Sequence, residues 1–196
     1  MSPVEPFEIV VVCTGNRFRS PIAEHVFRQA TLGLPVRVQS FGVLDLGSVG
    51  VLAEALEHGR TFGLDLGSHR ARRLGTESLA GADLVLGFER EHITTVVTSR
   101  SAARDRTFTL PELSEILVHV SPHAEGDAAM RARELVRRAA ALRAELQRGP
   151  PPEIPDPIGK ASRVYHETAL RVRELSEQIA RHLFPRGGAP TGASPR

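Results

Sequence analysis

The sequence predicts an α/β fold of three layers, in which a central four-stranded parallel sheet is covered by helices on both faces. Two observations support this fold class. Short apolar runs alternate along the chain with segments whose apolar residues recur at helical spacing, a pattern typical of a parallel sheet. Two of the strand-like runs, residues 7–13 and 82–88, are almost continuously apolar, as expected for strands buried on both faces.

Local patterns place the individual elements. The predicted strands are residues 7–13, 36–41, 82–88 and 106–110. The predicted helices are residues 21–31, 51–63, 90–97, 128–148 and about 161–184. Pro21 suits the first turn of its helix, whereas Pro111 is expected to open only a further turn.

The length of 196 residues suits one domain, and we expect it to span residues 1–185. Within it, residues 128–148 form an inserted, arginine-coated surface helix. The Gly- and Pro-rich residues 186–196 are expected to be a disordered tail.

Composition limits the possible functions and partners. The N-terminus lacks a signal-peptide pattern and no apolar run is long enough to span a membrane, so we expect a cytoplasmic protein without a membrane partner. The 25 basic and 23 acidic residues nearly cancel, and no basic patch interleaved with aromatic residues predicts a nucleic-acid partner. A single cysteine excludes an internal disulfide framework and a multi-cysteine zinc site.

That single cysteine, Cys13, ends the first predicted strand, where open parallel sheets bind ligands. The following Gly15 and Asn16 tolerate left-handed backbone conformations, so the loop can turn its N–H groups inward around an anion. Arg19 can grip two phosphate oxygens, and Ser20 can donate a hydrogen bond to the sulfur. Together these features stabilise a nucleophilic thiolate beneath a tetrahedral oxyanion.

Two motifs give the loop a family context. VCTGNRFRSP (12–21) resembles the signature of the low-molecular-weight protein tyrosine phosphatases, and DPIG (156–159) resembles their downstream Asp-Pro motif. The similarity extends through SFG (40–42), GLDLGSHRARRL (63–74) and FTLPEL (108–113). This resemblance implies a hydrolase that cleaves phosphomonoesters, chiefly phosphotyrosine in a phosphorylated protein substrate, through a phosphocysteine intermediate.

The resemblance also implies roles for individual residues. Cys13 would be the nucleophile, Arg19 would clamp the phosphate, and Asp156 would act first as acid and then as base. The other expected substrate-binding residues are Thr14, Gly15, Asn16, Arg17, Phe18, Ser20 and Ile158. Ser40 and His69 would join Asn16 in a hydrogen-bond network that supports the loop. No metal or cofactor is expected, because Arg19 and the loop amides carry the developing charge.

Three positions depart from the family pattern. Phe18 stands where many members carry a second cysteine, so an oxidised Cys13 lacks an internal thiol to rescue it. Ile158 replaces a residue that is often aromatic, and Phe41 either supplies a substitute ring or belongs to the core. Arg17 stands where relatives that act on phosphoarginine carry threonine, so it should repel a guanidinium substrate.

Two alternative functions remain open from the sequence. A thiol-dependent arsenate reductase that passes its adduct to a small-molecule thiol needs only one cysteine, although Asp156 favours ester cleavage. A catalytically silent phosphate-binding module would explain the departures, but it would not need Cys13, Arg19, Ser20 and Asp156 together. The oligomeric state is not set by the sequence.

Overall fold

A computed structural model describes residues 5–75, 79–98, 103–121, 125–146 and 149–185. The strands are β1 (Phe7–Cys13), β2 (Val36–Gly42), β3 (Leu84–Gly87) and β4 (Thr107–Thr109). The helices are α1 (Arg19–Ala30), α2 (Ala53–Thr61), α3 (Arg90–Thr98), α4 (Leu110–Leu117), α5 (Ala128–Leu146) and α6 (Ser162–Leu183). The expected tail, residues 186–196, lies outside the described residues.

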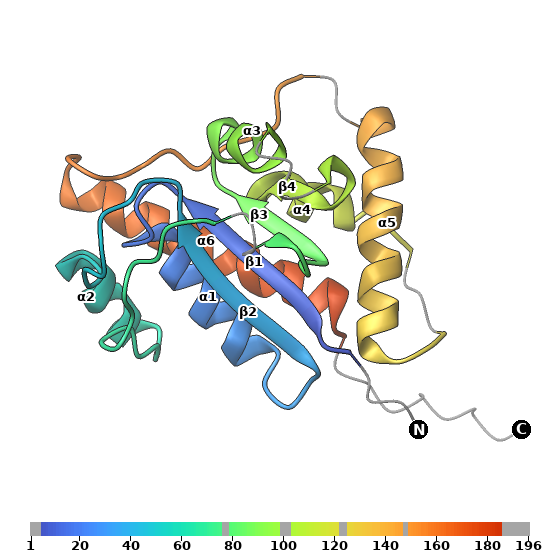
Figure 1. Cartoon of the computed structure of the whole chain (residues 1–196), viewed down its shortest axis with the longest axis horizontal. Coiled ribbons are helices and arrows are strands. Elements are labelled where there is room, and N and C mark those ends of the chain that lie inside the picture. Colours follow the sequence, from blue (N-terminus) through green and yellow to red (C-terminus); the bar gives the residue numbers. More distant parts are fainter. Residues whose placement is uncertain (1–4, 76–78, 99–102, 122–124, 147–148, 186–196) are drawn as a thin grey trace, which may run out of the picture.

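The four described strands form one parallel sheet, as the alternating pattern predicts, and the structure shows their order to be β2-β1-β3-β4. Side chains alternate across β1, so that Phe7, Ile9 and Val11 enter the larger core cluster together with residues of α1, α4 and α6. Val10 and Val12 join a smaller cluster on the opposite face, with Val96 of α3 among its members. Figure 1 shows α2 and α5 at opposite ends of this layered arrangement.

The region around Pro111 differs from the prediction. It forms a helix, α4, where only a turn was expected. Thr109 caps this helix through its hydroxyl, which accepts from the backbone N–H of Glu112, while the carboxylate of Glu112 accepts from the backbone N–H of Thr109. The sequence carries this capping signal as Thr-x-x-Glu, and the reciprocal bonds explain why the chain continues into a helix.

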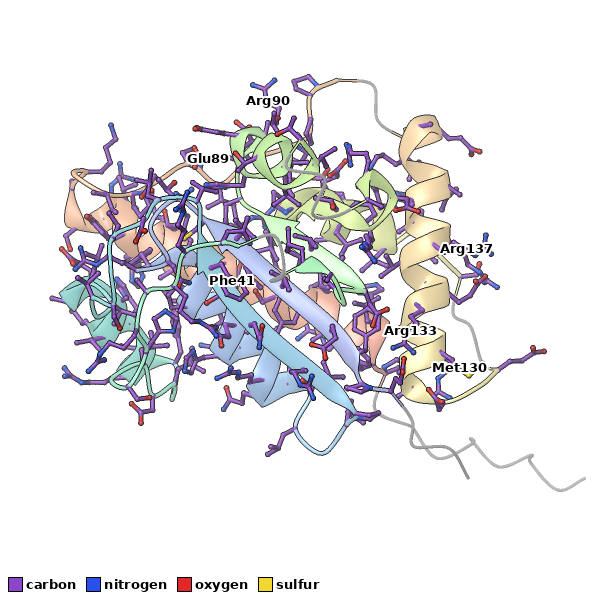
Figure 2. The ribbon with its side chains drawn as sticks, viewed as in Figure 1. Phe41, Glu89, Arg90, Met130, Arg133 and Arg137 are labelled. Atoms are coloured by element: carbon purple, nitrogen blue, oxygen red, sulfur yellow. The ribbon has the colours of Figure 1, made fainter. Side chains whose placement is uncertain are left out.

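Helix α5 forms within the predicted range and buries Leu135 and Ala139, whereas Leu146 is exposed. Its other arginines reach the surface at least in part, and Figure 2 labels Arg133 and Arg137, but Arg143 is buried over the ring of Phe108, which the arginine-coated surface predicted from the sequence did not include. Arg133 binds Asp83 just before β3, with Nε 2.9 Å from Oδ1. This ion pair ties the helix to the sheet. Among the described residues, no helix has both the length and the apolar character needed to cross a bilayer.

Candidate active site

The candidate site lies at the carboxyl edge of the sheet, at the end of β1. This strand lies between β2 and β3: the chain runs from β1 out to β2 and then crosses back past β1 to β3, so the winding of the sheet changes direction at β1. Such a change of direction opens a crevice where parallel α/β folds bind ligands. Cys13 is the last residue of β1, and α1 begins at Arg19, two residues earlier than predicted. Residues 14–18 therefore form a short loop between the strand and the helix N-terminus, a position that suits anion binding.

The backbone of this loop is tightly curled. Asn16 has a φ of 53°, in the left-handed region that its sequence position predicts. Gly42 of β2 packs directly against the curl, since a Cβ at this position would lie 2.9 Å from the carbonyl carbon of Gly15. Within the described residues, the backbone N–H groups of Gly15, Arg17 and Phe18 donate to no protein acceptor. The loop therefore offers free donors to an anion.

The sulfur of Cys13 is buried and accepts two hydrogen bonds. The backbone N–H of Asn16 lies 3.2 Å from Sγ, and the Ser20 hydroxyl lies 3.0 Å from it. Ser20 Oγ itself accepts from Asn16 Nδ2 at 2.9 Å, so its own proton is free to point to the sulfur. Two donors therefore point at Sγ, and one of them is the Ser20 hydroxyl that the sequence places there.

Asn16 is the centre of the network expected from the family resemblance. Its amide orientation is fixed, because Oδ1 accepts from the backbone N–H of Arg72 at 3.0 Å. Nδ2 then donates to Ser40 Oγ at 2.7 Å as well as to Ser20. His69 Nε2 lies 3.2 Å from both the backbone oxygen and Oδ1 of Asn16, so this nitrogen carries a proton. The structure thus brings Asn16, Ser40 and His69 together around the loop.

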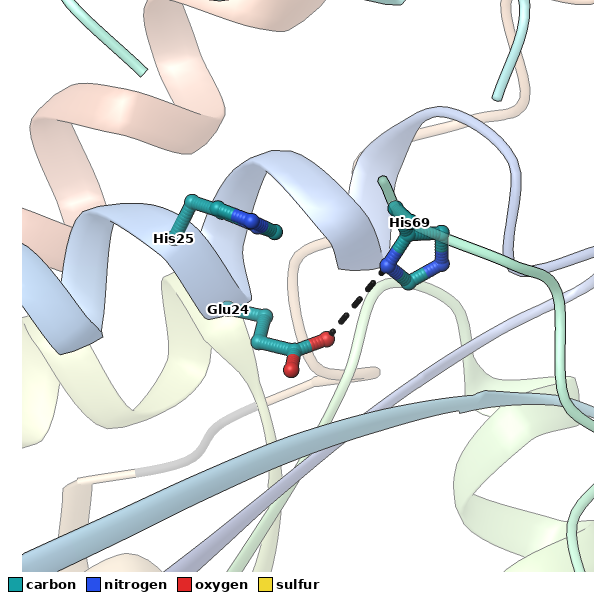
Figure 3. Close-up of side chains that lie close together, drawn as sticks. All are labelled: Glu24, His25 and His69. Carbon is teal, nitrogen blue, oxygen red and sulfur yellow. Dashed lines mark ion pairs between the residues drawn. The ribbon is translucent and has the colours of Figure 1, made fainter. Parts of the chain in front are cut away.

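Glu24 of α1 also belongs to this network, because it contacts both Ser40 and His69, and sequence reasoning missed it. Its carboxylate accepts from the Ser40 hydroxyl. One carboxylate oxygen also lies 3.8 Å from His69 Nδ1, the pair joined by the dashed line in Figure 3. Burial lowers the pKa of His69, although the charge of Glu24 opposes this shift. Burial thus disfavours a charge on this ring, while the two Asn16 oxygens select the form that carries a proton on Nε2.

Glu24, His25 and His69 also form a group whose potential metal-ligand atoms lie within 4.8 Å of one another (Figure 3). Charge argues against a cation there. Arg28 Nη2 lies 2.5 Å from Glu24 Oε1, and Arg72 Nη2 lies 3.9 Å from the same oxygen. Two guanidinium groups therefore already neutralise the single carboxylate, and a divalent ion would have to displace them. We assign this group a bracing role.

The Arg19 guanidinium connects three parts of the chain. Nη1 donates to Glu89 Oε2 at 2.5 Å and to the Ile154 carbonyl at 2.9 Å. Nη2 donates to Thr14 Oγ1 at 3.0 Å and to Asp156 Oδ2 at 2.5 Å. Side-chain exposure is 1% for Arg19 and 29% for Asp156. The buried cation thus holds the half-exposed carboxyl of Asp156 beside the cysteine loop.

Glu89 and His92 are further residues that sequence reasoning missed. Glu89 lies between β3 and α3, where Figure 2 shows it beside Arg90, and His92 lies in the first turn of α3. The available signal was their position, since the carboxyl ends of neighbouring parallel strands meet at one edge of the sheet. Reading that signal requires knowing that β3 lies next to β1, which the sequence does not state.

The remaining predicted residues have different surroundings. Phe18 packs its ring against Tyr165 at 5.2 Å and His58 at 6.3 Å between centroids, so it contributes to the core. Arg17 is half-buried, and its Nε donates to the Gly50 carbonyl at 2.9 Å. Ile158 is 51% exposed beside Asp156, whose Oδ1 accepts from its N–H.

Phe41 does not replace the missing pocket ring. It is buried in the smaller core cluster on the other face of the sheet, beneath the guanidinium of Arg72, whose Cζ lies 4.7 Å from the ring centroid. Of the two roles that the sequence left open for Phe41, the structure supports the core role. Figure 2 shows this residue over β2.

Comparison with known proteins decides the family. Residues 8–148 match the profile of the low molecular weight phosphotyrosine protein phosphatases. The chain belongs to this family. It is 38% identical over 99 residues to the low molecular weight protein-tyrosine-phosphatase Etp of Escherichia coli K12. The aligned segment covers 50% of this chain and 66% of that protein. It is 28% identical over 178 residues to the protein-arginine-phosphatase of Bacillus subtilis strain 168. That alignment covers 90% of this chain and 96% of that protein.

Solved structures share the fold of this family member over most of its length. The low molecular weight protein tyrosine phosphatase from T. tengcongensis superposes with a TM-score of 0.63 at 29% identity, covering 88% of this chain and 97% of that one. The YwlE arginine phosphatase from Geobacillus stearothermophilus superposes with a TM-score of 0.66 at 26% identity, covering 90% of this chain and 92% of that one. Tyrosine phosphatases and arginine phosphatases therefore both occur among proteins of this architecture.

Proposed function

We propose that this protein is a cysteine-dependent phosphatase that hydrolyses phosphomonoesters, with protein phosphotyrosine as its substrate class. The observation that supports this most directly is the position of Arg19. It belongs to the cysteine loop, yet its Nη2 holds Asp156, which lies 137 residues further along the chain. Nucleophile, phosphate clamp and proton donor thus lie together at the carboxyl edge of the sheet, as a two-step displacement requires.

The first step forms a bond between Cys13 Sγ and phosphorus while the bond to the ester oxygen breaks. The electron pair of that bond goes to the leaving oxygen, which takes a proton from the Asp156 carboxyl. The loop N–H groups and Arg19 stabilise the charge on the equatorial oxygens. In the second step, Asp156 takes a proton from water, the water oxygen bonds to phosphorus, and the S–P bond breaks to release inorganic phosphate.

Charge at the loop favours an ester substrate over phosphoarginine. Arg17 Nε is fixed by the Gly50 carbonyl, so a second guanidinium remains beside the loop. A cationic substrate group would be repelled there, whereas an acidic peptide would be attracted. Exposed aliphatic side chains lie close by: Leu46 approaches Gly15, and Ile158 lies beside Asp156. These apolar surfaces suit the ring of a phosphotyrosine.

The test is hydrolysis of p-nitrophenyl phosphate between pH 5 and 8 with EDTA present. We expect Cys13→Ser to abolish turnover and Asp156→Asn to reduce kcat by roughly 10²–10⁴-fold, the usual contribution of general acid catalysis. Asp105→Asn, a change at a distant exposed carboxylate, is the matched control and should retain full activity. Peptides carrying phosphotyrosine, phosphoserine or phosphoarginine then rank the substrates.

The alternatives give distinct results in the same assays. Thiol-dependent reduction of arsenate without phosphatase turnover would replace the proposal with an arsenate reductase. Binding of inorganic phosphate without either reaction would indicate a silent phosphate-binding module. Faster turnover of phosphoarginine than of phosphotyrosine would overturn the substrate class while keeping the chemistry.

A further inference from the structure

His92 lies in the first turns of α3 with only 1% of its surface exposed. Its Nδ1 faces two backbone donors, the N–H groups of Phe88 at 3.3 Å and Glu89 at 3.1 Å. A nitrogen that faces two donors must accept, so Nδ1 keeps its lone pair and the ring proton is on Nε2. The two backbone bonds therefore select one neutral tautomer of His92.

The Nε2 atom of His92 lies 3.1 Å from Thr14 Oγ1 in the cysteine loop. Since Nε2 carries the proton, it donates and the hydroxyl oxygen accepts. Thr14 Oγ1 accepts a second hydrogen bond from Arg19 Nη2 at 3.0 Å. Both lone pairs of the oxygen are thus used, and the hydroxyl proton of Thr14 must point away from these two donors.

We propose that His92 is a positioning residue of this site, which directs the Thr14 hydroxyl proton toward the phosphoryl group and steadies the Arg19 guanidinium through the shared Thr14 oxygen. This inference rests on the proposed phosphatase function. His92 lies outside the two motifs at residues 12–21 and 156–159, and its ring reaches the loop only because β3 lies beside β1. The relay runs from the backbone after β3 through His92 to Thr14 and Arg19.

The surroundings of His92 keep it neutral. Burial lowers its pKa to about 4, and the charge of Arg19 adds to this effect, while Asp156 and Glu153 oppose it. Glu89 Oε2 lies 3.9 Å from Nε2, beyond hydrogen-bond distance. A protonated ring would direct an Nδ1–H at two backbone donors and lose both bonds, so the relay needs the neutral form.

Two substitutions separate the two functions of the ring. In His92→Asn, the side-chain oxygen can replace Nδ1 as the acceptor of the backbone N–H groups, but nothing reaches Thr14. In His92→Gln, the longer amide can place an N–H near the position of Nε2 and donate to Thr14. We expect His92→Asn to lower kcat/KM for p-nitrophenyl phosphate about tenfold, the effect of one hydrogen bond of about 1.4 kcal/mol, and His92→Gln to recover most of that loss.

A double-mutant cycle tests whether His92 acts through Thr14. Thr14→Val removes the hydroxyl with little change in shape and should cost a similar factor. Thr14→Val combined with His92→Asn should be no worse than Thr14→Val alone, because the second change removes a bond that no longer exists. His119→Asn, at an exposed histidine, is the control and should match the wild type.

The inference is overturned if the double variant loses the product of the two single losses, or if folded His92→Asn retains full activity. Melting temperatures confirm that each variant is folded. Should His92→Asn fail to fold, His92→Ala, which also removes the donor to Thr14, takes its place in the cycle with Thr14→Val, and full additivity there would be equally decisive. The cycle is also measured as the Kd for inorganic phosphate by calorimetry. An inactive wild type would refute the proposed function, while the coupling in phosphate affinity would still decide the role of His92.

Discussion

The neutral state of His92 makes a quantitative prediction about stability and pH. In the folded chain its pKa is lowered from 6.5 to about 4, chiefly by burial. This difference of about 2.5 in pKa corresponds to about 3 kcal/mol, since a pKa difference of one is equivalent to about 1.36 kcal/mol. The histidine is exposed to water in the unfolded chain, where it regains its ordinary pKa.

Proton binding sets the direction in which the free energy of unfolding changes with pH. As the pH falls below 6.5, His92 binds a proton in the unfolded chain, whereas the folded chain does not bind it until about pH 4. The free energy of unfolding therefore decreases across this window, by about 3 kcal/mol from His92 alone. Above pH 6.5 this contribution is fully present, and near pH 4 it is lost.

Urea unfolding followed by far-UV circular dichroism measures the effect, because the chain has no tryptophan to serve as a fluorescence probe. Wild type and His92→Asn are compared between pH 7 and pH 4. Burial also lowers the pKa values of His58 and His69, but both residues are retained in the variant and their contributions cancel in the difference. The stability advantage of the wild type should shrink by about 3 kcal/mol toward pH 4. Parallel pH profiles for the two proteins would refute the assignment of a buried neutral His92.

Four further predictions concern the loop and its support. Gly42→Ala should abolish most phosphatase activity, because its Cβ would meet backbone atoms of the loop at 2.9–3.0 Å; phosphate affinity by calorimetry should fall with it. Phe18→Ala should lower the free energy of unfolding in urea by about 3–5 kcal/mol, since it removes a ring buried against Tyr165. Arg17→Thr should raise kcat/KM for phosphoarginine relative to phosphotyrosine, which competition assays would show. After peroxide treatment, activity should return only with an added thiol, because Cys13 has no second cysteine; recovery in thiol-free buffer would contradict this.

The sequence by itself determined the fold class and the chemistry-bearing loop. Continuous apolar runs and helical spacing are local properties, so β1 and the main helices could be placed from them with errors of a few residues at their ends. Cys13, Arg19 and Ser20 lie within one short motif, and their closeness in space follows from their closeness in the chain. The family resemblance extended this reasoning to Asp156, Ser40 and His69, which the chain alone could not have connected.

The tertiary structure decided which distant residues complete the site. The strand order β2-β1-β3 brings Glu89 and His92 to the cysteine loop, and a different order would have placed them elsewhere with the same local pattern. Glu24 reaches Ser40 because α1 packs against β2, a contact that no spacing within α1 encodes. Long-range packing also turned Phe18 into the core, where its ring contacts Tyr165 of α6. Local sequence sets which backbone conformations are favourable, whereas the burial of apolar faces against one another selects which side chains meet.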